Sequence, residues 1–347
     1  MAQDAANPPS TELELMERLT EPGEASIEAA RKLEGDVLIL GAGGKIGPAL
    51  GLFIHRSLLR AGSRNRVICV SRFSNASTAM MLGRAGIRTI SADLLNRRDL
   101  ERLPDAPYVY YLAGMKFGAS ASPALTWAMN TLLPFLVAER FSASRIIALS
   151  TGNVCPFVHP ETGGATEETP PDPVGEYAQS CLGRERMIEY VSQTRGTSAL
   201  IVRLNYACDL RYGVPVDIAV KLQEHSPIDL SMGYFNVIWQ GDLNAVLLRA
   251  AALCAVPPPI LNVTGPDVVR VRDAAAHMAK LMDLPEPEFA GVEGETALLS
   301  NSSKCWLLFG PPSVGTETLL DWTAHWVSIG APVLDRPTHF EQRNGKF

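Results

Sequence analysis

The chain has 347 residues, a formal net charge of −6 at pH 7 and 46% hydrophobic residues. A chain of this length is expected to form one large and one smaller domain. The acidic balance and the lack of a Lys/Arg run argue against a nucleic-acid partner, and no apolar run is long enough to span a membrane.

The predicted elements alternate between strands and helices along most of the chain. Residues 1–35 are polar and acidic, and we expect them to form a helical appendage outside the main fold. Strands are then predicted at 36–41, 66–71, 87–91, 107–113, 145–150 and 199–204. Helices are predicted near 45–61, 75–85, 97–103, 122–143 and 175–194, with a kink or break at Pro134. This order predicts an α/β fold with a Rossmann-type, doubly wound parallel sheet.

The first predicted strand runs into a glycine-rich turn. Val37 to Leu40 are apolar, and Gly41, Gly44 and Gly47 follow at regular spacing before a helical pattern. Such glycines permit a tight turn, close approach of a pyrophosphate and close helix–strand packing. The helix N-terminus offers unpaired N–H groups to the phosphates. The turn therefore predicts a dinucleotide site, the alternative being a strand–helix turn that binds nothing.

A nucleotide triphosphate loop is a second interpretation of the same turn. Gly44 and Lys45 fit that motif, but Ile46 stands where a Ser or Thr would bind Mg²⁺. We therefore set that interpretation aside.

The dinucleotide-binding Rossmann domain is placed at residues 36–208, with 236–266 returning to it. The smaller C-terminal substrate-binding region is placed at 209–235 and 267–347.

Several further motifs follow in order. They are Ser91-Ala92-Asp93-Leu94, Tyr111-Leu112-Ala113-Gly114-Met115-Lys116, Asn130, Ala148-Leu149-Ser150-Thr151-Gly152-Asn153-Val154 and Glu176-Tyr177. Over about residues 36–330, the chain resembles the extended short-chain dehydrogenase/reductase family, the NAD(P)-dependent epimerase/dehydratase group. The resemblance implies that Asp93 and Leu94 lie at the adenine and that Leu112, Ala113, Gly114, Lys116 and Asn130 lie along the cofactor. It also implies that Gly41, Gly44, Lys45, Ile46 and Gly47 bind the cofactor's phosphates.

The resemblance implies that Thr151 and Tyr177 are catalytic, but the expected lysine is missing. The family places a Lys four residues after the Tyr, where it shares a helix face and lowers the Tyr pKa. Here that position holds Cys181, which carries no positive charge. Arg184 or Lys116 are candidates to replace the charge. The alternatives are a solvent-facing Arg184, which is more common, and a Lys116 that only pairs with an anion.

The end of the second predicted strand bears on the cofactor. Enzymes that use NAD place an acidic residue there, whereas this chain has Ser71-Arg72. We expect Arg72, with Lys45 nearby, to pair with a 2′-phosphate, which favours NADP over NAD. The alternative is that Arg72 is a solvated charge.

The six cysteines and six histidines give no metal or disulfide pattern. We expect reduced thiols in a cytoplasmic protein, with no metal site. Two functions remain open. One is an NADP-dependent oxidoreductase, epimerase or dehydratase acting on a small carbonyl, hydroxyl or sugar-nucleotide substrate. The other is a non-catalytic dinucleotide-binding sensor or partner-binding module. A homodimer is expected from the resemblance.

Overall fold

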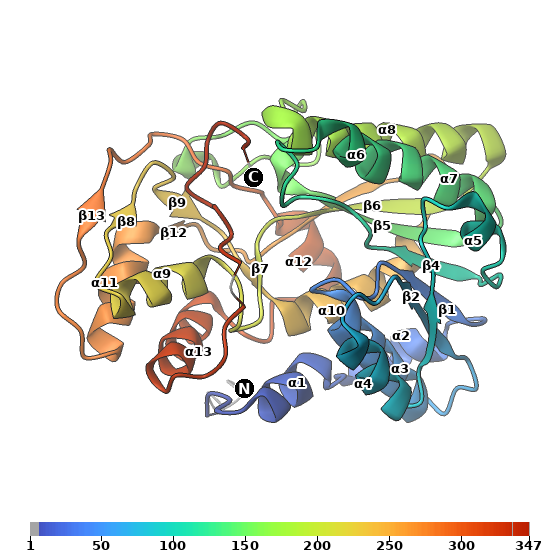
Figure 1. Ribbon diagram of the computed structural model, residues 1–347, viewed down its shortest axis with the longest axis horizontal. Helices are drawn as coiled ribbons and strands as arrows, with labels where there is room; N and C mark the ends of the chain where they lie inside the picture. Colours follow the sequence, from blue (N-terminus) through green and yellow to red (C-terminus); the bar gives the residue numbers. More distant parts are fainter. Residues whose placement is uncertain (1–6, 335, 347) are drawn as a thin grey trace.

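A seven-stranded parallel sheet forms the centre of the computed structural model, which describes residues 7–334 and 336–346. The strand order is β11-β6-β5-β4-β1-β2-β3 (Figure 1). The strands are β1 (Val37–Leu40), β2 (Val67–Ser71), β3 (Arg88–Ser91), β4 (Tyr108–Tyr111), β5 (Arg145–Thr151), β6 (Ala199–Leu204) and β11 (Ile260–Val263). The six predicted strands are thus confirmed, and β11 adds a seventh beside β6. The doubly wound α/β prediction is also confirmed.

Helices cover both faces of this sheet, which explains why its central strands are continuous apolar runs. One face carries α2 (Glu24–Arg31), α3 (Gly47–Arg60), α4 (Ala76–Arg84) and α10 (Gln240–Ala250), which share one core. The other face carries α5 (Arg97–Glu101), α7 (Leu133–Arg140) and α8 (Gly175–Arg195), which share another. Both layers are visible in Figure 1.

The break expected at Pro134 is a single wide turn inside one long helical segment. Between α6 (Pro123–Trp127) and α7, residues Ala128–Leu132 form a π-helical turn, η1. Pro134 lies in the first turn of α7, where its missing N–H needs no partner. The wide turn lets the helix continue past the proline.

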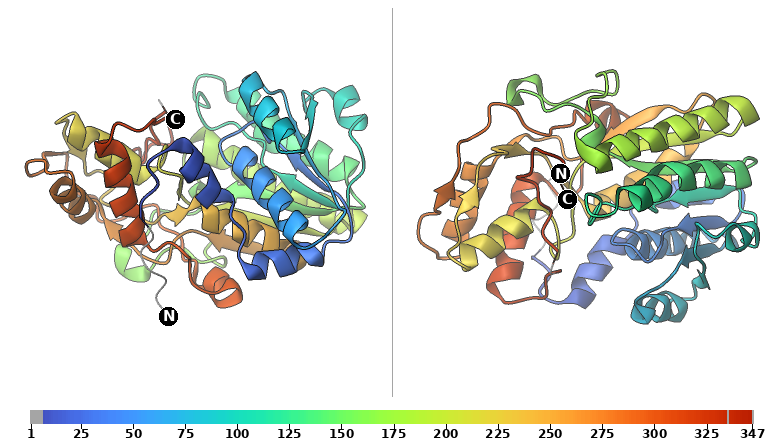
Figure 2. Two further views of the ribbon diagram at one scale, coloured as in Figure 1. Left: turned by 90° about the horizontal axis from the view of Figure 1, so that it is seen from below. Right: turned by 45° about the horizontal axis from the view of Figure 1, so that its top comes forward.

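The two N-terminal helices are packed into the molecule, so the expectation of an appendage outside the main fold is wrong. In α1 (Glu12–Thr20), Leu15 and Leu19 are fully buried. Arg18 lies with its guanidinium carbon 5.1 Å from the ring centroid of Trp322 in α13 (Thr316–Ser328), and Figure 2 shows the two helices side by side. The spacing of Leu15 and Leu19 on one helix face was the signal for this burial.

Replacing Leu19 by alanine is expected to lower the free energy of unfolding by about 2–5 kcal/mol, because it empties a buried site. Urea unfolding followed by circular dichroism measures this. Leu13→Ala is the matched control, since Leu13 is 71% exposed on the same helix. Equal effects of the two substitutions would show that α1 is not part of the cooperative core.

A smaller region lies beside the carboxyl end of the sheet and has its own core. It contains α9 (Val214–Gln223), α11 (Val271–Leu281) and α13, with the strand pairs β8 (Ile228–Asp229)/β13 (Phe289–Ala290) and β9 (Tyr234–Phe235)/β12 (Val269–Arg270). The pair β7 (Ala207–Cys208)/β10 (Ile238–Trp239) connects it to the sheet, and α12 (Ser303–Phe309) packs against β11. No helix in the described part of the chain is long and apolar enough to cross a membrane.

The last residues return from α13 across the junction of the two regions. We call residues 336–346 the C-terminal segment. Thr338 donates hydrogen bonds from its backbone N (2.8 Å) and its hydroxyl to the Asp217 carboxylate in α9. Phe340 is buried, and Gly345 packs against Val174 and Gly175 at the start of α8. The segment thereby ends between the two regions, as Figure 1 shows.

Candidate functional site

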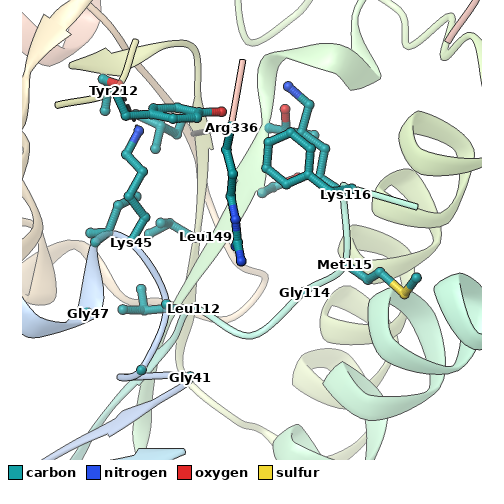
Figure 3. Close-up of a pocket in the computed structure, with 18 of the residues that line it drawn as sticks. Gly41, Lys45, Gly47, Leu112, Gly114, Met115, Lys116, Leu149, Tyr212 and Arg336 are labelled. Carbon is teal, nitrogen blue, oxygen red and sulfur yellow. Dashed lines mark hydrogen bonds between the residues drawn. The ribbon is translucent and has the colours of Figure 1, made fainter. Parts of the chain in front are cut away.

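A cavity of about 680 Å³ opens at the carboxyl ends of β1, β4, β5 and β6, where open α/β sheets bind ligands. Its wall brings together ten of the residues singled out from the sequence, several of which are labelled in Figure 3. They are Gly41, Gly44, Lys45, Ile46, Gly47, Leu112, Gly114, Lys116, Thr151 and Tyr177. They come from three separate strand ends, those of β1, β4 and β5, and from the start of α8, so only the fold places them together.

The glycine turn has no room for side chains at two of its positions. Gly41 has φ +88°, and a Cβ there would lie 2.7 Å from the backbone N of Ala113. A Cβ on Gly47 would lie 2.5 Å from the Cα of Ala42. At Gly44 the nearest atom is 3.3 Å away, which leaves this side of the turn more open. The first glycine makes the turn, and the last packs α3 against it.

The turn also carries unpaired hydrogen-bond donors. Within the described residues, no acceptor is assigned to the backbone N–H of Lys45, Ile46 or Gly47, which precede or begin α3. Pro48 follows at the start of α3, where a proline removes no helix bond. Unpaired N–H groups at a helix N-terminus favour a bound anion. This wall of the cavity therefore fits the pyrophosphate of a dinucleotide.

Thr151 and Tyr177 meet at the opposite wall. The Thr151 hydroxyl lies 2.9 Å from Asn153 Oδ1, and it is also hydrogen-bonded with Tyr177. Burial raises the pKa of Tyr177, and nearby Cys181 adds to this, while Arg184 and the Thr151 hydrogen bond act in the opposite direction. The phenol is therefore protonated at neutral pH and carries a proton that it can donate, but it does not act as a base.

Cys181 is fully buried behind Tyr177 and does not line the cavity. It packs in a small cluster with Val154, Cys155 and Ala165, and its side chain is hydrogen-bonded with Tyr177. Burial raises the pKa of Cys181, so it stays a neutral thiol at neutral pH. All six cysteines are free. Cys181 thus acts as a packing residue that touches the tyrosine.

Arg184 in α8 does not face solvent, so the expectation of a solvent-facing side chain is wrong. Its side chain is buried and lines the cavity. It donates from Nη1 to the Leu149 carbonyl at 2.6 Å and from Nη2 to Asn130 Oδ1 at 2.9 Å. A Cβ on Gly114 would lie 2.5 Å from Nη2, so the glycine makes room for the guanidinium. A permanent positive charge is thereby fixed close to Tyr177.

Two lysines extend into the cavity from opposite sides, as Figure 3 shows. Lys45 Nζ lies 3.2 Å from the Ala207 carbonyl and 3.2 Å from the ring centroid of Tyr212. Lys116 Nζ donates to the Thr338 carbonyl at 3.1 Å. Burial lowers the pKa of each lysine to about 8. Each ammonium group therefore loses its proton more easily than that of an exposed lysine.

The remaining predicted residues lie outside the cavity wall: Ser71, Arg72, Asp93, Leu94, Ala113, Asn130 and Cys181. Arg72 is exposed at the end of β2, and Leu94 is buried in a sheet core. Asn130 is buried and bonds to both the N and the O of Met115 at 2.8 Å, so it shapes the loop that lines the cavity. Lys45 is directed to Ala207 and Tyr212, which gives no support to the expectation that it joins Arg72 in binding a 2′-phosphate.

Sequence reasoning missed several residues of the wall, among them Asn75, Thr78, Asn205, Tyr206 and Arg336. Asn75 lies in the short loop after β2 and caps α4, which is a detectable signal for a position at the sheet edge. No local sequence signal marks Arg336 as a cavity residue, because it lies far in sequence from the strands that form the cavity. Among the described residues, no group of three or more His, Cys, Asp or Glu is placed to hold a metal ion.

Known proteins share the fold of this chain, and a family model matches part of its sequence. Residues 37–207 match the model of the NAD dependent epimerase/dehydratase family, and no curated protein matches the chain significantly. Three similar solved structures each cover 84% of this chain, with 98% of their own chains matched. UDP-glucose 4-epimerase from Thermotoga maritima, solved with UDP-glucose, has a TM-score of 0.68 and 17% identity. UDP-glucose 4-epimerase from Thermus thermophilus, solved with NAD, has 0.67 and 18%.

The third is UDP-glucuronic acid 4-epimerase from Bacillus cereus, solved with NAD, with a TM-score of 0.67 and 16% identity. Such low identities establish the common fold alone. The family model runs from the start of β1 to the first residue of β7, a stretch that includes the glycine turn, Thr151 and Tyr177. An NAD(P) dinucleotide is the typical cofactor of this family. Residues 37–207 of this chain thus belong to the NAD-dependent epimerase/dehydratase family.

Proposed function

We propose that this protein binds an NAD(P) dinucleotide in the cavity and acts as an oxidoreductase, epimerase or dehydratase on a small hydroxyl or carbonyl compound. The observation that carries the proposal is the Thr151–Tyr177 pair facing the glycine turn across one cavity. When bound, the dinucleotide supplies hydride chemistry. The turn N–H groups of Lys45, Ile46 and Gly47 would hold its pyrophosphate.

The residues of the opposite wall would handle the proton. Tyr177 would donate a proton to a substrate oxygen, with Thr151 holding the tyrosine hydroxyl in place. Arg184 would supply the positive charge that the lysine of the family motif supplies elsewhere, since the guanidinium is fixed by Leu149 and Asn130. Cys181 would contribute packing and its hydrogen bond to the tyrosine.

For the cofactor itself, the exposed Arg72 and the absence of a carboxylate at Ser71-Arg72 favour NADP. The similar structures solved with NAD weigh against this preference, so titration with both NADPH and NADH decides between the two cofactors.

For the substrate, the similar structures include epimerases of UDP-glucose and UDP-glucuronic acid. A sugar nucleotide is therefore one substrate class to test.

A homodimer remains part of the proposal. Large apolar side chains are exposed along α6, η1 and α8: Leu125, Trp127, Leu132 and Tyr190. Exposed apolar patches of this kind favour a protein interface.

The second candidate is a non-catalytic dinucleotide-binding sensor, and Cys181 is the observation that favours it. In that case the cavity binds the cofactor but Tyr177 transfers no proton. The two functions therefore predict different effects on turnover when the Tyr177 hydroxyl is removed.

Tyr177→Phe is expected to lower NAD(P)-linked turnover at least 100-fold while leaving dinucleotide affinity within about twofold, because only the proton donor is lost. Cys181→Lys restores the family spacing and is expected to raise turnover. The measurement is NAD(P)H absorbance with a panel of carbonyl and sugar-nucleotide substrates. Unchanged turnover in Tyr177→Phe, together with no gain in Cys181→Lys, would contradict the enzyme proposal and favour the sensor.

A further inference from the structure

One side chain on the cofactor side of the cavity comes from the far end of the chain. Arg336 belongs to the C-terminal segment, yet it lines the cavity together with Gly41, Gly44 and Gly47 of the glycine turn. In Figure 3, the Arg336 side chain extends into the cavity with its guanidinium directed toward the side of the turn. Only the folded chain brings this charge to the turn, since the two are far apart in sequence.

The backbone on both sides of Arg336 is held by the folded protein. Leu334 donates from its backbone N to the Arg211 carbonyl at 2.8 Å. Thr338 is buried and donates from its backbone N to the Asp217 carboxylate at 2.8 Å. These contacts set the course of the chain past the cavity mouth. Arg336 therefore reaches a ligand with little further loss of backbone freedom.

The charge of Arg336 is not matched by an anion of the cavity wall. None of the described residues that line the cavity has a carboxylate. Within residues 7–334 and 336–346, the Arg336 guanidinium has no hydrogen bond or ion pair, whereas Arg184 is engaged by Leu149 and Asn130. The N-terminus of α3, at the turn, carries the positive end of a helix dipole, which disfavours a nearby cation. An anion between the two would remove this conflict.

The glycine turn itself directs no side-chain cation at a phosphate. Lys45 is its one charged residue, and Nζ of Lys45 lies 3.2 Å from the Ala207 carbonyl and 3.2 Å from the ring centroid of Tyr212. What the turn offers is backbone N–H groups and a helix dipole equivalent to about half a positive charge. Each phosphate of a pyrophosphate carries a full negative charge, so a further cation at this place stabilises the bound form.

We propose that Arg336 binds the dinucleotide pyrophosphate across the cavity from the glycine turn, so that the C-terminal segment closes over the bound cofactor. This inference rests on the proposed function, because it concerns the same dinucleotide. A guanidinium suits two-point binding of phosphate oxygens. Thr338 ties the segment to α9 of the smaller region, so cofactor binding also stabilises the junction of the two regions.

The first test is calorimetric titration of cofactor-free protein with NADH, NADPH and inorganic pyrophosphate. Arg336→Gln is expected to weaken all three at least 10-fold, because they share the pyrophosphate group. Arg336→Lys keeps the charge without the two-point geometry and is expected to fall in between. Arg336 is exposed, so its replacement leaves the core intact. Arg186→Gln, which changes an exposed arginine on α8, is the matched control and is expected to bind as the unmodified protein does.

The second test is amide hydrogen exchange in residues 336–346, with and without the tighter-binding dinucleotide. Bound dinucleotide is expected to slow exchange in this segment at least threefold in the unmodified protein. Arg336→Gln, compared at equal saturation, is expected to lose this protection, because the link between cofactor and segment is removed. Protection that persists unchanged in Arg336→Gln would show that the arginine does not hold the segment on the cofactor.

Three titration results would overturn the inference: affinities that Arg336→Gln leaves unchanged, an equal loss in Arg186→Gln, or a loss confined to NADPH. The last would place the arginine at the 2′-phosphate instead. If neither dinucleotide binds the unmodified protein, the proposed function fails on its own. The pyrophosphate titrations of the unmodified protein and of Arg336→Gln then still decide whether the arginine and the turn form a phosphate site.

Discussion

Gly47→Val is expected to weaken dinucleotide binding at least 100-fold, or about 2.8 kcal/mol. A side chain at this position would lie 2.5 Å from the Cα and 2.6 Å from the carbonyl O of Ala42. Neither atom can move without displacing the turn, so the N–H groups of Lys45 and Ile46 would lose their alignment toward the phosphates. Calorimetric titration with NADH and NADPH measures the loss, with thermal unfolding recorded in parallel.

The control is Gly83→Val in α4, where a Cβ would meet no atom within 4 Å. This variant is expected to bind the dinucleotide as the unmodified protein does. If folded Gly47→Val also binds normally, the turn does not hold the phosphates and the cofactor lies elsewhere.

Arg184→Met is expected to lower the free energy of unfolding by about 2–4 kcal/mol, because it removes charged hydrogen bonds from buried acceptors. The lost bonds are those to the Leu149 carbonyl and to Asn130 Oδ1. The same substitution removes the positive charge beside Tyr177, so turnover is expected to fall along with stability. Urea unfolding measures the first effect, and NAD(P)H absorbance measures the second.

Arg186→Met is the matched control on α8, because Arg186 is exposed and forms an ion pair with Glu189 three residues later. An exposed pair of this kind contributes less than about 1 kcal/mol. Arg184→Lys keeps the charge without the two-point geometry and is expected to fall between the two. A loss below about 0.5 kcal/mol in Arg184→Met would show that the guanidinium does not organise this wall.

The sheet was predictable because its signals are local. Apolar runs such as Val37–Leu40 mark strands covered on both faces, and the glycine spacing marks the turn that follows. The wide turn before Pro134 was anticipated only as a break, since a proline does not specify how the chain accommodates it. The missed strand β11 is four residues long, and its place beside β6 depends on pairing across about 60 intervening residues.

The site was predictable only in part, because its charges arrive from distant segments. Thr151 and Tyr177 follow from ordered motifs, and the structure brings them into one cavity. Arg184 lies where helical spacing aims it toward the site, but its burial depends on Gly114 leaving space in another loop. Arg336 depends on the path of the C-terminal segment, which Asp217 fixes through Thr338. Such tertiary contacts leave no periodic pattern in the sequence.

Calorimetric titration of cofactor-free protein with NADPH and then NADH shows whether the cavity binds a dinucleotide. We expect one of them to bind with micromolar affinity, and stronger binding of NADPH would support the role of Arg72. Saturable binding that Gly47→Val abolishes would establish the cavity as a dinucleotide site. No binding of either dinucleotide to the folded protein would contradict the account, and the glycine turn would then serve the fold alone.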